Sequence, residues 1–166
     1  MRHIISILLQ NEAGALARVA AMFSTRGYNI ESLSVAATEN PLYSRLTLVT
    51  IGSDQVIDQI NKQLLKLVDV VTMADMTQGD HIERELLLIK VDVSDEGATR
   101  IRDLVKREGA LVLDDNPGNY TVELTSTCGR IDEFVEKLSS LAKILTVARS
   151  GPMAISRGPQ VLSASA

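Results

Sequence analysis

The sequence predicts an α+β fold of two similar modules, each with the ferredoxin-like order β-α-β-β-α-β. Two observations predict it. Apolar residues recur at strand spacing and at helix spacing in the same order in both halves of the chain. A shift of 74 positions also superimposes the second half on the first, and it pairs Ile57-Asp58 with Ile131-Asp132. Because 166 residues are enough for two small domains, a repeat of about half the chain is the expected organisation.

The first module is predicted from its helix signals and from the β-rich runs between them. Leu16, Val19 and Phe23 recur at the spacing of one helix face. Gly27 is a typical stop after such a helix, and Pro41 divides the following β-rich stretch into two strands. The predicted elements are strand 3–9, helix 16–23, strands 28–38 and 42–51, helix 56–67 and strand 68–76.

The second module repeats this order. Its clearest local signal is Pro117-Gly118, because proline presets φ at the first central position of a type II turn and glycine supplies the positive φ of the second. The predicted elements are strand 85–93, helix 98–105, strands 111–115 and 120–127, helix 131–141 and strand 144–149. The predicted domains are therefore 1–77 and 78–158, joined near residues 78–80, and a Ser/Ala-rich tail at 159–166 is expected to be frayed or disordered.

The predicted sheets carry apolar residues on both faces. An antiparallel sheet with helices on one face normally alternates apolar and polar residues, because its other face meets water. Here Ile5 and Ile7 point to one face, whereas Ile4 and Leu8 point to the other, and residues 86–89 behave in the same way. Either the other module or another subunit should cover the second face. Self-association is expected, because two small modules with few aromatic residues bury limited surface alone.

Composition excludes several classes of function. The net charge is −4 at pH 7, and two Phe, three Tyr and no Trp offer few platforms for base stacking, so no nucleic acid is expected as a partner. A single cysteine, Cys128, cannot form an intrachain disulfide, which fits a cytoplasmic protein. Two histidines without a cysteine pair make no metal site at known spacings. Neither a signal peptide nor an apolar run of membrane-spanning length is evident, so no membrane association is expected.

The sequence offers no catalytic constellation. It lacks a glycine-rich phosphate loop, a Gly-x-Ser-x-Gly elbow and a Cys/His pair beside an acid. Acidic residues at predicted helix starts and turns are ordinary capping and solvation features, although a small enzyme that uses them as acids or bases stays open as an alternative. His3 and His81 are expected to be structural or solvated. The acidic candidates are Glu12, Asp95-Glu96 and Asp114-Asp115.

One polar segment, from Asn11 to Leu16, joins the first strand to the first helix, where backbone N–H groups and the positive end of the helix dipole converge. Such a helix start can hold the carboxylate of an α-amino acid, and the side-chain oxygen of Asn11 can accept a hydrogen bond from the ammonium group. Gly14 lets a ligand approach the backbone without meeting a Cβ. In the alternative interpretation, Asn11 only caps the helix and Gly14 only serves a tight turn.

A second polar segment, residues 27–32, opens the following strand. Asn29 offers an amide that can donate and accept hydrogen bonds, and Ile30 is apolar. Taken alone, this segment is typical of the turn by which a chain leaves a helix.

Six motifs stand in register along the chain: Asn11-x-x-Gly14-x-Leu16, Arg26 to Leu33, Lys66 to Val70, Glu83 to Leu86, Ala148 to Gly151, and Ser156-Arg157-Gly158. Together they resemble the small, regulatory subunit of acetolactate synthase, also called acetohydroxyacid synthase. The resemblance covers Met1 to about Gly158. It implies that residues 1–77 form an ACT domain, which is a ferredoxin-like module that commonly senses amino acids, and that residues 78–158 form a ferredoxin-like domain particular to this family.

The same resemblance implies a function without catalysis in this chain. A large catalytic subunit would hold thiamine diphosphate, FAD and Mg²⁺ and would form acetolactate for the synthesis of valine, leucine and isoleucine, whereas this chain would hold no cofactor. The small subunit would raise the activity of its partner and confer feedback inhibition by valine. A free-standing ACT-type amino-acid sensor or transcription co-regulator stays open as an alternative.

The resemblance also implies where the effector binds. In similar proteins the site lies at the interface of an ACT homodimer, with the helix-start loop of one chain facing the second polar segment of the other. No catalytic and no metal-binding residue is expected. The positions that correspond to the valine site are Asn11, Gly14, Ala15 and Leu16 from one chain and Asn29 and Ile30 from the facing chain.

Overall fold

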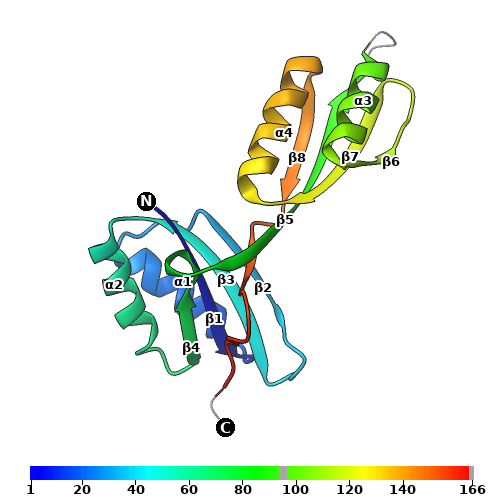
Figure 1. The fold of residues 1–166 in the computed structure, drawn as a ribbon. Coiled ribbons are helices and arrows are strands. Elements are labelled where there is room, and N and C mark those ends of the chain that lie inside the picture. The colour runs from blue at the N-terminus through cyan, green and yellow to red at the C-terminus, as the bar shows by residue number, and fades with distance from the viewer. Residues whose placement is uncertain (94–96, 165–166) are drawn as a thin grey trace. The chain divides into compact units, whose positions relative to one another are not determined.

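The computed structural model describes residues 1–93 and 97–164 of the chain. It contains two compact units (Figure 1): one comprises Met1–Ile82 and the segment that starts at Pro152, and the other comprises Glu83–Gly151. Each unit has an antiparallel sheet with two helices packed on it, and each follows the order β-α-β-β-α-β. The predicted fold class is confirmed.

The first unit is built on a four-stranded sheet of order β2-β3-β1-β4. The central strand β1 pairs with β3 so that Ile5 lies opposite Leu48 and Ile7 lies opposite Leu46. These side chains form a buried core with Val19 of α1 and with residues of α2. The elements are β1 (Arg2–Gln10), α1 (Ala15–Thr25), β2 (Ser32–Ala37), β3 (Tyr43–Ile51), α2 (Asp54–Leu64), β4 (Val70–Asp75) and the 3-10 turn η1 (Met76–Gln78).

The second unit repeats this plan with the strand order β6-β7-β5-β8. Gly118 has φ 92° and the Asn119 N–H donates to Asn116 O at 3.1 Å, as the predicted turn requires. Phe134 and Leu138 of α4 are fully buried against Ile89 of β5. The elements are β5 (His81–Asp92), α3 (Ala98–Glu108), β6 (Leu111–Asp114), β7 (Asn119–Ser126), α4 (Cys128–Leu141) and β8 (Ile144–Arg149).

The strand prediction differs from the structure at three places. One is β5, which begins at His81 rather than at residue 85. The second strand begins at Ser32 rather than at residue 28, because the chain turns after α1 with Gly27 at φ 71°. A further strand, β9 (Met153–Ser156), was not predicted, and it pairs with β5. Because β9 has only four residues, the alternation of apolar and polar residues is too short there to predict a strand.

The last segment of the chain belongs to the first unit, although the sequence prediction placed residues 152–158 in the second domain. Ala154 of β9 is buried in a small cluster with Ile4, Val49 and Met76. The Arg157 N–H donates to Asp80 O at 3.0 Å, which anchors the end of this segment. This packing explains why β1 is apolar on both faces: its second face is covered by the end of the same chain.

Of the tail predicted at 159–166, the structure describes the residues up to 164. These residues have no regular secondary structure beyond a bend. Arg45 of β3 donates through Nη2 to Leu162 O at 2.7 Å, so this part of the tail also lies against the sheet of the first unit.

The corresponding face of the second sheet is open. Leu87 and Ile89 of β5 are buried beneath the helices, but Leu86 is 38% exposed and Leu88 is 37% exposed on the other face. Leu111 of β6 and Leu88 of β5 both lie opposite Glu123 of β7. Leu111 is 58% exposed. Within the described part of the second unit, no segment covers this face. That another module or subunit covers it therefore stays a prediction.

Candidate functional site

The start of α1 is the most distinctive helix end of the first unit. Its N-cap residue is Gly14, with φ 90° and ψ −13°, and no side-chain hydrogen bond caps it. No acidic residue stands in the first turn. A helix leaves its first N–H groups without intrahelical acceptors, and here these include the N–H groups of Leu16 and Ala17. The positive end of the helix dipole is therefore available to an anion from outside the helix.

The backbone conformation at Gly14 favours glycine. Its positive φ is costly for a residue with a Cβ. In addition, a Cβ on Gly14 would lie 2.8 Å from Nη1 of Arg18. The Arg18 guanidinium thus lies directly beside the loop that leads into the helix.

Arg18 is held in place by the carboxylate of Asp69, which precedes β4. Its Nε and Nη2 donate to the two carboxylate oxygens, the second at 2.8 Å. Asp69 is only 3% exposed, and the hydrogen bonds from Arg18 hold the pKa of its carboxyl below the usual range. Because Asp69 uses only Nε and Nη2, the third nitrogen, Nη1, faces Gly14. The site therefore has a cation beside an open helix start.

Sequence reasoning did not single out Arg18. A signal was present, since Arg18 follows Gly14 by four residues and positions i and i+4 lie on the same face of a helix. The spacing could not show that Asp69, which is far away in the sequence, accepts hydrogen bonds from Nε and Nη2 of Arg18. It also could not show that Nη1 then lies beside Gly14.

Asn11 does not cap the helix, so that part of the alternative interpretation is wrong. Its Nδ2 donates to Pro41 O at 2.9 Å, and its Oδ1 accepts from Ser44 Oγ at 3.0 Å. The side chain therefore braces the helix-start loop against the turn that precedes β3. A primary amide can donate twice and accept twice, so Asn11 keeps one donor and one acceptor for a ligand.

The two following positions differ in what they can offer a ligand. Ala15 is 3% exposed and its N–H donates to Glu12 O at 3.2 Å, so its side chain is not accessible. Leu16 is 38% exposed and presents apolar surface next to the open helix start. Of these two predicted contacts, only Leu16 can touch a ligand through its side chain.

Asn29 and Ile30 lie beyond the other end of α1. Asn29 is exposed, and its Nδ2 donates to Glu31 Oε1 at 2.6 Å. Ile30 is half-buried and packs against the core of the first unit. Because α1 has 11 residues, its two ends are about 16 Å apart. One chain therefore does not bring Asn29 next to Gly14, and a site that contains both needs a second copy of the chain.

The first unit has an edge at which such a copy can pair. β2 stands at one end of the strand order, and its residues Val35, Ala36 and Ala37 are exposed. α1 leads from β1 to this strand and passes over β3, which lies between them. An edge strand presents unpaired N–H and C=O groups that favour pairing with another chain.

Two of the acidic candidates, Asp114 and Asp115, make local contacts in the second unit. Asp114 accepts from Asn116, and Asp115 pairs with Arg102 at 3.1 Å. Asp95 and Glu96 lie outside the described residues. Within residues 1–93 and 97–164, no group of three or more His, Cys, Asp or Glu side chains could hold a metal ion.

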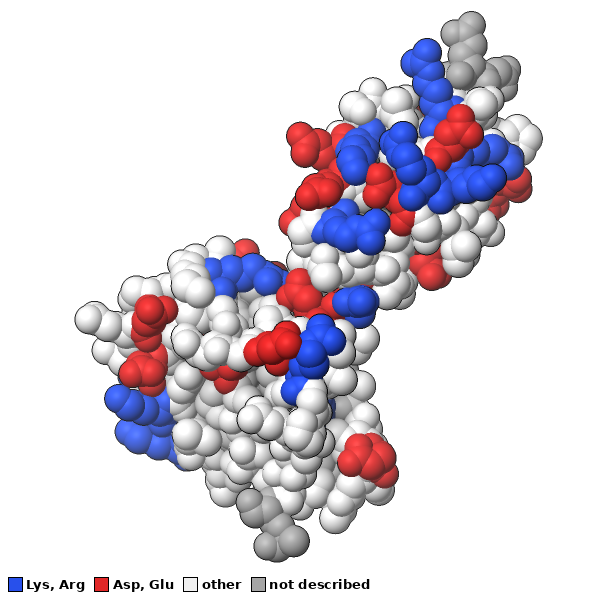
Figure 2. Space-filling view, in the orientation of Figure 1, with Lys and Arg blue, Asp and Glu red and all other residues white. Residues whose placement is uncertain are grey.

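Surface charge is distributed differently over the two units (Figure 2). On the face shown, acidic and basic residues are interspersed on the second unit, whereas much of the first unit is uncharged. In the described ranges, no helix is both long and apolar enough to cross a membrane.

A β-α-β-β-α-β unit with an open helix start after its first strand has the ferredoxin-like plan, which ACT domains share with other proteins. Residues 5–72 match the family described as the AHAS small subunit-like ACT domain. Residues 84–158 match the family described as the small subunit of acetolactate synthase. The chain belongs to the acetolactate synthase small-subunit family.

Individual relatives agree with this assignment over nearly the whole chain. The sequence is 48% identical over 166 residues to the acetolactate synthase isozyme 3 small subunit of Escherichia coli, with 98% of this chain and 99% of the relative covered. It is 39% identical over 158 residues to the acetolactate synthase small subunit of Mycobacterium bovis, with 95% and 94% covered. The crystal structure of the small subunit from Thermotoga maritima matches with a TM-score of 0.86 at 32% identity, and the match covers 96% of this chain and 99% of that chain.

Proposed function

We propose that this chain is the regulatory subunit of an acetolactate synthase in branched-chain amino-acid biosynthesis. It activates a large catalytic subunit in the cytoplasm and makes that subunit sensitive to inhibition by valine. Thiamine diphosphate, FAD and Mg²⁺ are held by the partner, and this chain contributes no catalytic residue. Membership of the small-subunit family supports the regulatory role.

The observation that carries the effector site is the open start of α1. A carboxylate placed there meets first-turn N–H groups, the positive end of the helix dipole and Nη1 of Arg18. Gly14 brings no side chain of its own to this point, so the Arg18 guanidinium can lie against the loop beside the helix start. This is the electrostatic environment that the α-carboxylate of an amino acid needs.

The rest of valine is recognised by the two polar segments. The ammonium group donates hydrogen bonds to the amide oxygens of Asn11 and Asn29. The branched side chain packs on Leu16 and on the exposed part of Ile30. Because Asn11 and Asn29 belong to opposite ends of α1, each site takes Asn11 from one chain and Asn29 from its partner in a homodimer. The α1 helices run antiparallel across that dimer.

A site shared by two chains couples ligand binding to assembly. Valine that binds only the paired state stabilises that state by mass action. The catalytic subunit, in turn, responds to the geometry of the paired state. Because coupling between two binding events is reciprocal, binding of the catalytic subunit must change the affinity for valine by the same factor by which valine changes the affinity for the catalytic subunit.

The test is to mix the chain with an acetolactate synthase large subunit and to titrate valine. The wild-type chain should raise acetolactate formation, and valine should reverse the increase. Asn11→Ala or Asn29→Ala should weaken inhibition by roughly tenfold to a hundredfold, because each removes a hydrogen bond to a charged group. Activation without valine should be retained.

Asn116→Ala, which removes an amide from a turn in the second unit, is the matched control and should leave inhibition unchanged. If both ACT variants stay fully sensitive to valine, the site assignment is wrong. If valine binds the chain but acetolactate formation never responds to the chain, a free-standing amino-acid sensor replaces the proposed function.

A further inference from the structure

The open face of the second sheet carries a row of side chains that crosses β6, β7, β5 and β8. Leu111 of β6 and Leu88 of β5 lie opposite Glu123 of β7, and on its other side Leu88 lies opposite Ala148 of β8. Leu86 points the same way as Leu88, because residues two apart on a strand share a face. All three leucines are exposed. We call this surface the leucine face.

The corresponding face of the first unit is not left open. Ile4 of β1 is buried there, because Ala154 of β9 packs on it. β9 and the described residues that follow it belong to the first unit. No described segment of the second unit covers the leucine face, and contiguous exposed apolar surface of this kind marks an interaction site.

Two residues of opposite charge stand near the middle of the leucine face. Glu123 lies between Leu88 and Leu111 in the row. Lys90 is the next residue after Leu88 on this face of β5, and it lies opposite Thr121 of β7. Both charged side chains are half-buried. In the described parts of the chain, neither of them makes an ion pair.

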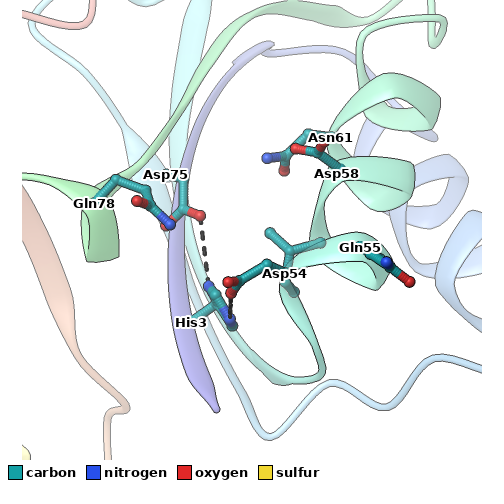
Figure 3. A pocket seen from close by; sticks show the side chains of 8 residues that line it. His3, Asp54, Gln55, Asp58, Asn61, Asp75 and Gln78 are labelled. Carbon is teal, nitrogen blue, oxygen red and sulfur yellow. Dashed lines mark ion pairs between the residues drawn. The ribbon is translucent and has the colours of Figure 1, made fainter.

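His3 in the first unit has what these two residues lack. Its ring is buried, and carboxylates of the same chain flank it (Figure 3): Nδ1 lies 3.5 Å from Asp75 Oδ2, and Nε2 lies 3.7 Å from Asp54 Oδ1. A charge that loses water without gaining a partner of opposite sign costs free energy. A surface that covers the leucine face must therefore bring a carboxylate to Lys90 and a cation to Glu123.

We infer that the leucine face packs against the leucine face of a second copy of this chain. A surface that has one charge of each sign beside apolar side chains is complementary to itself. A twofold axis between two such faces can place Lys90 of each copy opposite Glu123 of the other, and the leucines of both copies are then buried between the two sheets. This inference does not depend on the proposed valine site, which belongs to the first unit.

The test links Lys90 to Glu123 with a carbodiimide, which joins an amine directly to a carboxylate in contact with it. Because the two residues are also diagonal neighbours within one chain, the reaction is run on Lys90→Gln and Glu123→Gln chains that have been unfolded and refolded together. In that mixture a link between Lys90 and Glu123 can only join two chains. Mass spectrometry of the tryptic peptides should detect the link.

Leu88→Asp on both chains should lower the yield of this link about tenfold or more, because the interface would then bury carboxylates without partners. Leu111→Asp should act in the same way at a more exposed position, where the substitution disturbs the fold less. Leu65→Asp makes the same change at an exposed leucine of the first unit, so it is the matched control and should leave the yield unchanged.

Two outcomes would overturn the proposal. One is a refolded mixture that has the circular dichroism of the wild type but no link between chains. The other is a link whose yield is the same in Leu88→Asp and in Leu111→Asp as without them. If the link is absent and the methyl signals of Leu88 shift only when a large catalytic subunit is added, that subunit covers the leucine face and the proposal is wrong.

Discussion

The two helices of the first unit begin in opposite electrostatic settings, although they pack on the same sheet. At α2 the Ser53 side chain accepts from the Val56 N–H, and Asp54 stands in the first turn. At α1 the N-cap is Gly14, no side chain caps the helix, and the first turn has no acid. The start of α2 is thus satisfied by its own residues, whereas the start of α1 is left for a ligand.

This difference shows where a small regulatory unit can place a binding site without weakening its fold. The positive end of a helix dipole lies at the start of α1 and also at the start of α2, so the dipole alone does not make a binding site. What distinguishes α1 is the combination of a glycine that keeps the N-cap position empty and an arginine fixed by Asp69 beside it. Substitutions that make the two helix starts alike should therefore remove the effector response.

The largest effect is expected from Gly14→Asp, which gives α1 a side-chain cap, as Ser53 does at α2, and an acidic group near the helix start, as Asp54 does at α2. The new carboxylate would compete for the first-turn N–H groups and for Arg18, and the positive φ would be strained. Inhibition by valine should weaken by about a hundredfold or more. Ser53→Asp, which exchanges one good cap for another at α2, is the control and should keep the wild-type valine titration.

A smaller effect is expected from Arg18→Lys. Lysine keeps a positive charge next to the buried Asp69, but its single nitrogen cannot pair with that carboxylate and also face the loop at Gly14. The concentration of valine needed for half-inhibition should rise about tenfold, while activation is retained. An unchanged valine titration would show that the guanidinium only braces α1.

Ser53→Ala at the start of α2 should lower stability and leave valine inhibition unchanged. It removes the side-chain cap of α2, so the free energy of unfolding should fall by about 1 kcal/mol, and valine inhibition should not change. Urea unfolding followed by circular dichroism measures the first quantity, and the coupled synthase assay measures the second. A loss of valine sensitivity in this variant would mean that the two helix starts are not independent.

The smallest effect near neutral pH is expected from titration of Asp69. Its pKa is lowered in the folded chain by Arg18, so the pair contributes stability above the ordinary Asp pKa of about 3.9 and loses it as the pH falls through the lower folded value. The difference in unfolding free energy between the wild type and Asp69→Asn should therefore be constant from about pH 8 to pH 5 and shrink below about pH 4. A difference that already changes near pH 6 would contradict this assignment.

The sequence was sufficient for the four helices, for eight of the nine described strands and for the loop that carries the proposed site, because periodicity and turn residues are local signals. It could not show β9, since Met153–Ser156 is short and its partner β5 lies far away in the chain. For the same reason it attributed the apolar second face of β1 to another module or subunit, whereas Ala154 of the last segment covers Ile4.

The side-chain roles were harder to predict than their positions. Asn11 braces Pro41 and Ser44 rather than the helix, and Arg18 owes its place to Asp69. His3 was expected to be structural or solvated, and the structure buries it beside two carboxylates. All of these roles depend on contacts between distant parts of the chain, which spacing alone does not encode.

The central claim, that valine binds between two chains at the start of α1, is tested most directly by mixing two resistant variants. In a dimer of one Asn11→Ala chain and one Asn29→Ala chain, one site has lost both amides and the other has lost neither. Unfolding and refolding the two variants together should therefore restore valine binding in equilibrium dialysis to about a quarter of the wild-type number of sites, at wild-type affinity. If the mixture binds valine no better than the separate variants do, the site is not shared between chains and the claim is wrong.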